Sequence, residues 1–161
     1  MSSRLRLFVL MVHVVSSVGW LGAVSCYLAL TLVALPSPDA PAGRAAYVAM
    51  DLVTRLVIVP LALGSSLSGI VSSLGTSWGL LRHYWVLVKV LLALPATLVL
   101  LLHTAPIGEL ARVAEDPGLA VADLGRLRAQ LFAAAAAAVV VLVVATALSV
   151  YKPRGRTSFP I

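Results

Sequence analysis

The sequence has little of what usually holds a small domain together. Cys26 is the single cysteine among 161 residues, so no internal disulfide can form, and no Cys-x-x-Cys or Cys/His cluster suggests a structural zinc site. Catalytic signatures are also missing: there is no Gly-x-Ser-x-Gly, no His-Glu-x-x-His, no phosphate-binding loop and no pair of acids in an apolar pocket. The sequence leaves enzyme activity open but favours a non-catalytic role, and it makes hydrolysis the least expected chemistry.

Charge is scarce as well, because only 11% of residues are charged whereas 61% are hydrophobic, and the mean hydropathy is +1.05. Soluble globular proteins do not have this composition. The net charge of +6 does not indicate nucleic acid, because the basic residues stand at the ends of apolar runs rather than in one patch. Membrane topology and anionic lipid headgroups account for these positions better, so the expected partner is the lipid bilayer.

Four apolar segments are each long enough to cross a hydrocarbon core, which needs about 20 helical residues. They cover residues 5–35, 47–74, 84–105 and 127–151. We therefore predict one all-α domain over residues 1–161, an integral membrane four-helix bundle of up-down-up-down topology. A Pro-rich link, a short Gly/Arg turn and a polar stretch over 106–126 connect the segments, and short amphipathic helices on the membrane surface are expected at 109–112 and 123–128.

The charges also predict the orientation, since Lys and Arg near helix ends are retained on the cytoplasmic side. With the N-terminus inside, one set of basic residues falls on the inner side: Arg4, Arg6, Arg82, Lys89, Lys152, Arg154 and Arg156. All six acids then fall on the outer side: Asp39, Asp51, Glu109, Glu115, Asp116 and Asp123. We expect a multi-pass protein of the plasma membrane with both termini in the cytoplasm. A cleaved signal at Cys26 is the weaker alternative, because the apolar run is too long for a signal-peptide core.

Helices in lipid associate through small residues and polar side chains. The second segment has the spacings Gly64-x-x-x-Ser68 and Ser65-x-x-x-Gly69, so it is expected to pack closely on its neighbours. The alanine run at 133–138 in the fourth segment is expected to favour helix formation and close packing. Pro95 is expected to kink the third segment.

The first segment carries three ring side chains on one side. His13, Trp20 and Tyr27 repeat every seven residues, which places them on one helix face directed into the bundle. They are candidate ligand-binding residues, and the alternative is that His13 only hydrogen-bonds a neighbouring helix.

Four further ionisable residues lie within the apolar segments, where such groups are costly and usually face a partner or a wet cavity. Asp51 and Arg55 are spaced i, i+4, so they are either an intrahelical ion pair or part of an anion or quinone-oxygen site. Lys89 is either a site residue or a side chain that reaches the headgroups, and His103 is either a ligand-binding residue or an interfacial histidine. All four remain candidates for ligand binding.

Helix geometry separates these residues into two levels along the bundle. With a rise of about 1.5 Å per residue, His13 and Lys89 belong to an inner level, and Asp51, Arg55 and His103 to an outer one. His13 and His103 then differ by roughly 16 Å in height, which disfavours a haem held by both histidines. A haem b with one histidine ligand stays possible, so the cofactor is left open and the metal ligand would be His13 or His103.

Three stretches carry a resemblance: residues 78–89 (WGLLRHYWVLVK), 100–104 (LLLHT) and 148–155 (LSVYKPRG). They are similar to small, mainly actinobacterial membrane proteins of domain-of-unknown-function family 2269, and residues 13–22 faintly resemble copper-resistance D-type membrane domains. The resemblance implies a four-helix fold and places Lys89 and His103 within the family's motif. Relatives often have a histidine about where this chain has Ala134, and that departure puts a haem or metal ligand in doubt.

Three functions follow as hypotheses. The first is a non-catalytic membrane protein that binds a small hydrophobic or redox ligand, haem or a quinone, within the bundle. The second is transport of a small solute or ion, which four short helices would perform only as a homo-oligomer. The third is a structural subunit of a larger membrane complex that uses the acidic loop over 109–123.

Overall fold

A computed structural model describes residues 2–74 and 84–151 of the chain, and the described residues form only helices and short connections. The elements are α1 (Ser3–Ala34), α2 (Pro41–Val53), a π-helical turn η1 (Thr54–Ile58), α3 (Val59–Leu74), α4 (Tyr84–Glu115), a 3-10 turn η2 (Val121–Leu124) and α5 (Gly125–Tyr151). Because α2, η1 and α3 are continuous, the described residues form four helical stretches of 31 to 34 residues, each long and apolar enough to cross a membrane.

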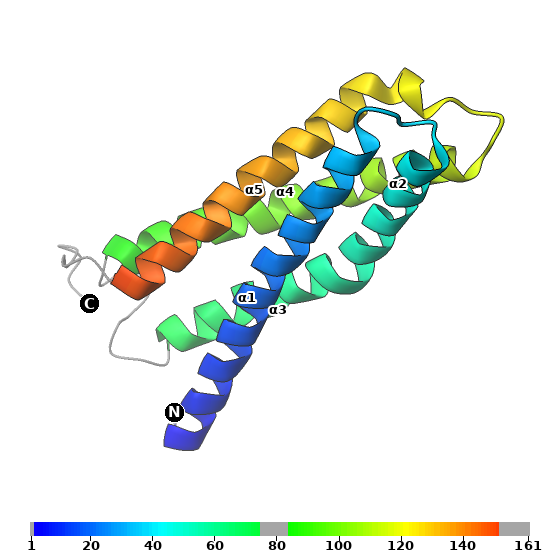
Figure 1. The fold of residues 1–161 in the computed structure, drawn as a ribbon. Helices are drawn as coiled ribbons and strands as arrows, with labels where there is room; N and C mark the ends of the chain where they lie inside the picture. The colour runs from blue at the N-terminus through cyan, green and yellow to red at the C-terminus, as the bar shows by residue number, and fades with distance from the viewer. Residues whose placement is uncertain (1, 75–83, 152–161) are drawn as a thin grey trace.

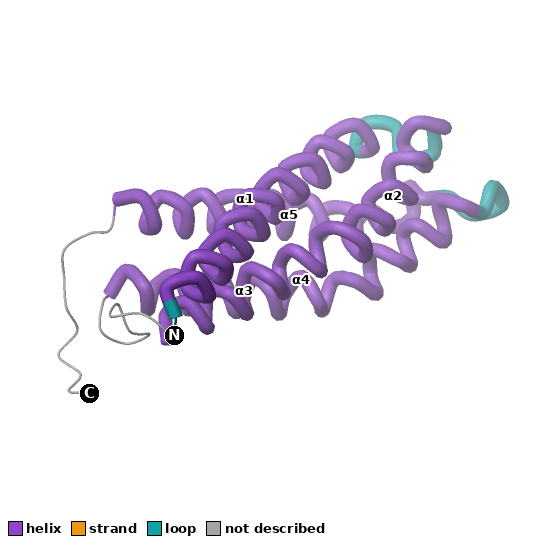
Figure 2. Tube along the Cα trace, turned by 90° about the horizontal axis from the view of Figure 1, so that it is seen from below, coloured by secondary structure: helices purple, strands orange, loops and turns teal. Residues whose placement is uncertain are grey.

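Successive stretches run in opposite directions and pack side by side as a four-helix bundle (Figure 1). The beginning of α1 and the end of α5 lie at the same end of this bundle, and the connections around α2 and η2 lie at the other, as Figure 2 shows from a second side. Around the bundle, α1 packs on α3, α3 on α4, α4 on α5 and α5 on α1. The predicted all-α four-helix packing is confirmed.

Two helices extend beyond the bounds that apolar runs predict. α4 continues through Pro106 to Glu115, so the segment over 109–112 belongs to a long helix and not to a separate surface helix. Burial explains this extension, because Ile107 and Leu110 are 4% and 1% exposed and join the core. The free energy gained by burying these side chains outweighs the cost of the backbone hydrogen bond that is lost because Pro106 has no N–H. α2 likewise begins at Pro41, a residue that suits the first helical turn because its N–H would have no partner there.

The second stretch bends at η1 between α2 and α3 (Figure 1). In this turn the N–H of Val59 donates to the carbonyl of Thr54, which is the five-residue spacing of a π-helix. Pro60 follows directly, and it lacks the N–H that would bond the carbonyl of Leu56. The wider turn accommodates Pro60, and it places Thr54 and Ile58 in the bundle interior, where they are 0% and 2% exposed.

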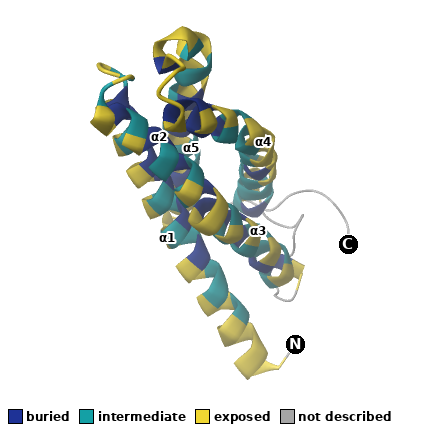
Figure 3. Ribbon diagram, turned by 90° about the vertical axis from the view of Figure 1, so that its right-hand side faces the viewer, coloured by how far each residue is buried: buried dark blue, intermediate teal, exposed yellow. Residues whose placement is uncertain are grey.

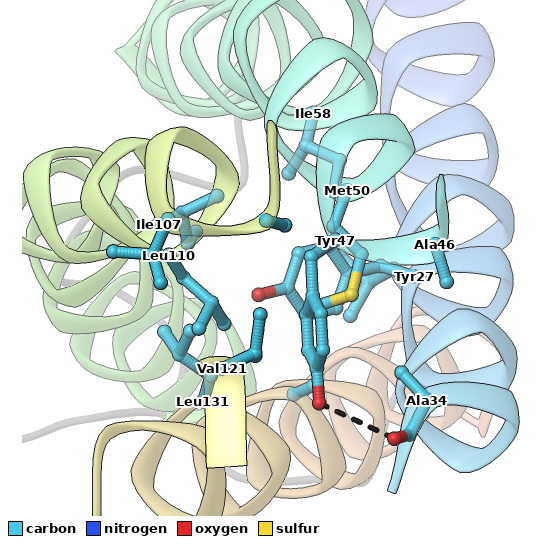
Figure 4. Packing of buried hydrophobic residues seen from close by; sticks show 14 of the residues in the cluster. Tyr27, Ala34, Ala46, Tyr47, Met50, Ile58, Ile107, Leu110, Val121 and Leu131 are labelled. Atoms are coloured by element: carbon cyan, nitrogen blue, oxygen red, sulfur yellow. Dashed lines mark hydrogen bonds between the residues drawn. The ribbon is translucent and has the colours of Figure 1, made fainter. Parts of the chain in front are cut away.

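The most tightly buried core lies at the end of the bundle where α2, η2 and the start of α5 meet. Side chains exposed by 2% or less there include Tyr47, Met50, Leu110, Val121 and Leu131, and Figure 4 shows several of them packed together. Toward the other end, exposed residues predominate on the outer side of the helices (Figure 3). These exposed residues are mainly apolar, as expected for helices that contact lipid.

Asp39 and Arg44 link helix ends at the end of the bundle where α2, η2 and the start of α5 meet, which we call the core end. The Asp39 carboxylate accepts the backbone N–H groups of Val121 and Ala122 at 2.7 and 3.1 Å, and it pairs with Arg44 at 2.9 Å. The Arg44 guanidinium also donates to the last carbonyls of α4 and the turn after it, including Asp116 at 2.9 Å. One ion pair thus joins the start of α2, the end of α4 and η2.

Candidate functional site

A cavity of about 310 Å³ lies between the helices. Its walls come from α1, η1, α4 and α5, and they are almost entirely apolar. The lining residues are Trp20, Val24, Tyr27, Thr54, Ile58, Leu91, Leu92, Pro95, Ala96, Val99, Leu100, His103, Ile107, Leu131, Ala134, Ala135, Ala137, Ala138 and Val141. Concave apolar sites with a few polar groups are the usual form of small-molecule sites, whose volumes start at about 300 Å³.

The alanine run of α5 forms one wall of the cavity. Four of its residues, Ala134, Ala135, Ala137 and Ala138, line the space opposite the α4 side chains. A methyl group fills much less volume than the leucines and valines around it, so the short side chains leave the space open. The run was expected to bring helices close together; its cavity-facing side leaves room between them instead.

Within the part of the chain that the structure describes, Tyr27 places a buried hydroxyl without a hydrogen-bond partner in the cavity wall. Its side chain is 5% exposed, and its buried hydroxyl has no hydrogen-bond partner among the described residues. Figure 4 shows the hydroxyl directed into the space between the helices, toward Ile107 and Leu110. An unpaired buried hydroxyl costs about 1–3 kcal/mol, so Tyr27 gains a partner if a ligand places a polar atom here.

His103 faces the same cavity from α4. Its Nδ1 lies 2.7 Å from the carbonyl oxygen of Val99. Because a carbonyl only accepts, Nδ1 carries the proton and Nε2 is left as an acceptor or metal ligand. Tyr27 and His103 therefore offer complementary groups, an O–H that donates and a ring nitrogen that accepts.

His13 belongs to a different part of the bundle. It donates from Nδ1 to the carbonyl oxygen of Ser65 at 3.0 Å and approaches the Ser68 hydroxyl at 3.3 Å, so it links α1 to α3. Ser17 adds a hydroxyl contact of 2.8 Å to Ser65, and Gly69 lies directly beneath the His13 ring. The side of α1 that carries His13, Trp20 and Tyr27 does face the bundle, as predicted, but His13 is not part of the cavity wall.

Asp51 and Arg55 pair with each other along one helix. Arg55 Nε donates to Asp51 Oδ1 at 2.7 Å, so the predicted intrahelical ion pair is confirmed. The guanidinium also lies against Gly108, where a side chain would displace it. Neither residue lines the cavity.

Lys89 lies at the inner level with His13, close enough for the two groups to interact electrostatically. Its Nζ is 5.9 Å from the centre of the Trp85 ring, one turn earlier on α4, which is a cation–π distance. Of the five His, Asp, Arg and Lys candidates, only His103 lines the cavity, so this cavity is not a polar path across the membrane.

Two arginines that organise the core end were not among the predicted site residues. Arg44 is one, and Arg128 is the other: it donates to the Tyr47 hydroxyl at 2.9 Å and to the carbonyl of Leu35 at 2.8 Å, just beyond the end of α1. Their partners are mostly backbone carbonyls at helix ends, which carry partial negative charge. Such partners are distant in sequence and leave no motif.

No family model, curated protein or solved structure matches the chain. The resemblance to domain-of-unknown-function family 2269 and to copper-resistance D-type domains therefore stays a prediction.

Proposed function

We propose that this chain is a plasma-membrane protein that binds a small amphiphilic redox ligand, a quinone, in the cavity between α1, α4 and α5. The observation that carries the proposal is the Tyr27 hydroxyl, which is buried and unpaired in an apolar cavity that His103 also lines. A quinone carbonyl would accept from Tyr27, and the hydroxyl of the reduced quinol would donate to Nε2 of His103. The apolar walls would hold the rest of the ring.

Haem is the second candidate, and the His103 geometry favours it. A metal-binding histidine usually donates its other ring N–H to a carbonyl, as His103 does to Val99. The haem would have one histidine ligand, since His13 is engaged by Ser65 and lies outside the cavity. The volume favours the quinone, because about 310 Å³ is near the lower limit of ligand sites and a porphyrin is larger than a quinone ring.

The termini of the proposed protein are cytoplasmic. The beginning of α1 and the end of α5 share one end of the bundle (Figure 1). Arg4 and Arg6 stand at that end, whereas Asp39, Glu109 and Asp116 stand at or near the other, together with Arg44, Arg112, Arg126 and Arg128. By sequence, seven of the twelve Lys and Arg residues belong to the side of the termini and five to the opposite side. Positive charge is retained in the cytoplasm, so the core end of the bundle faces outward.

Extraction of the purified protein tests the ligand. Protein taken from native membranes in mild detergent is expected to contain about one quinone per chain by mass spectrometry, or to show a Soret band if the ligand is haem. Tyr27→Phe is expected to lose most of a bound quinone, whereas the matched control Tyr84→Phe, an exposed tyrosine outside the cavity, keeps it. Wild-type protein with neither a quinone nor a Soret band would overturn the proposal.

A further inference from the structure

The cavity is long and partly open. Its α5 wall reaches from Leu131 to Val141, which is about 15 Å at 1.5 Å per residue. Its α4 wall is longer, from Leu91 to Ile107, or about 24 Å. A ring head group would occupy only part of that length, which leaves apolar wall for a chain; we call this elongated apolar space the channel.

The two ends of this channel differ in burial. At one end Tyr27, Ile107 and Leu131 are 5%, 4% and 2% exposed. Halfway along the α4 wall Val99 is 44% exposed, and at the other end of that wall Leu91 is 62% exposed, whereas Trp20 on the α1 wall is only 2% exposed. The channel therefore begins deep in the bundle and reaches the surface along α4.

The opening lies between α4 and α5. Leu91, Pro95 and Val99 are all exposed and are spaced by four residues, so they form one edge of a gap along α4. Ala137, an exposed residue of the cavity wall on α5, lies on the other edge. Because both edges belong to helices that cross the membrane, the gap opens to lipid and not to water.

Tyr27 and His103, two wall residues with an unused hydrogen-bonding atom among the described residues, lie in the half of the channel between Val99 and Ile107. The Tyr27 hydroxyl is buried there, and the half-buried His103 stands one turn beyond Val99 toward Ile107. The open part is lined by aliphatic side chains and Pro95. This distribution matches a molecule with a polar head and a long apolar chain.

We infer that the occupant is an isoprenoid lipid with a quinone head, which enters sideways from the bilayer and leaves its tail in the gap between α4 and α5. The inference rests on the proposed function and adds the chemical class of the ligand and its route. A ligand from the aqueous phase would need no tail and no gap toward the lipid.

Two quinones and two variants test the inference. Detergent-solubilised, extracted wild-type protein is incubated with a naphthoquinone carrying a four-isoprene tail, or with the same ring without a tail. Free ligand is then removed by gel filtration, and the quinone retained per chain is measured by mass spectrometry. Ala137→Phe fills the gap, and Ala133→Phe is the matched control, since Ala133 is an exposed member of the same alanine run that does not line the cavity.

The tailed quinone is expected to be retained about tenfold better than the tailless ring, a difference of ~1.4 kcal/mol. Ala137→Phe is expected to remove most of this advantage, and Ala133→Phe to preserve it. Equal retention of the two quinones by wild-type protein would overturn the inference while the proposed function stands, and this comparison needs no variant to fold. Unchanged tail preference in Ala137→Phe would overturn the gap as the route, and retention of neither quinone would contradict the proposed function itself.

Discussion

Tyr27 on α1 and His103 on α4 face one apolar cavity, and each has one hydrogen-bonding atom that no described residue satisfies. One atom donates and the other accepts, so the pair is suited to a ligand that carries both an acceptor and a donor. The remaining polar side chains of the described bundle interior are mostly engaged, as with Ser66 and Thr97, whose hydroxyls lie 2.9 Å apart. Within the described bundle, this cavity therefore holds a hydrogen-bond donor and an acceptor that are available to a ligand.

Removing the Tyr27 hydroxyl should affect stability and ligand binding in opposite directions, because the ligand-free protein becomes more stable while the bound quinone is lost. In ligand-free protein, Tyr27→Phe is expected to raise the free energy of unfolding by up to about 1 kcal/mol, because it eliminates an unpaired buried group. The control Tyr47→Phe should lower it by about 1–3 kcal/mol, since the Tyr47 hydroxyl accepts from Arg128 and its loss leaves that donor short of a partner. Denaturation in detergent, followed by circular dichroism, measures both; a marked loss of stability in Tyr27→Phe would mean that its hydroxyl has a partner.

Two glycines should respond oppositely to alanine. A Cβ at Gly43 would lie 2.9 Å from the carbonyl oxygen of Pro38 and closer still to that of Ser37, both rigid backbone atoms, whereas a Cβ at Gly22 would meet nothing within 4 Å. Gly43→Ala is expected to destabilise the protein by about 1–3 kcal/mol through overpacking. Gly22→Ala should stabilise it by about 0.5–1 kcal/mol, because alanine favours a helix interior. The same unfolding assay measures both variants. A Gly43→Ala protein with an unchanged free energy of unfolding would show that the link before α2 does not pack tightly against that helix.

The Asp39 ion pair predicts how stability depends on acid. The N–H groups of Val121 and Ala122, together with the Arg44 guanidinium, hold the pKa of Asp39 below its ordinary value of 3.8. The carboxylate therefore stabilises the fold fully above the pKa that it has in the unfolded chain, and this contribution is lost as the pH falls through the lowered pKa. Wild-type protein should lose stability below about pH 4, and Asp39→Asn should be less stable at neutral pH with a flatter acid profile. Parallel acid profiles for the two proteins would rule out this role.

His13 and His103 should have separate roles. His13→Ala is expected to cost about 0.6–2 kcal/mol of stability, the usual range for a hydrogen bond between helices in a membrane protein, and to leave the ligand content unchanged. His103→Ala should reduce the ligand content with little change in stability, because its one hydrogen bond among the described residues is to Val99 on its own helix. Mass spectrometry and unfolding of the two variants provide the comparison, and loss of ligand in His13→Ala alone would reverse the assignment.

The number of helices and the inward side of α1 could be predicted from the sequence, because both follow from periodicity and length. The Asp51–Arg55 pair was also predictable as one of two alternatives, since its spacing lies within one helix. The extent of α4 was not, because the missing N–H of Pro106 is visible in the sequence whereas the burial of Leu110 by another helix is not.

The cavity could not be predicted for a similar reason. It exists where the short side chains of α5 stand opposite α4, and the sequence shows the alanines without showing what faces them. Arg44 was also missed, because its carbonyl partners Val113, Ala114 and Asp116 lie 69 to 72 residues away. Tyr27 and His103 were candidates from the start, but only the fold shows that they share one space.

The most direct measurement is an experimental structure of the protein purified from native membranes and held in a lipid disc. Continuous density is expected in the cavity, with a ligand atom within hydrogen-bonding distance of the Tyr27 hydroxyl, about 2.5–3.0 Å, and a tail that leaves between α4 and α5. An empty cavity, or a Tyr27 hydroxyl bonded to another side chain of the protein, would contradict this expectation.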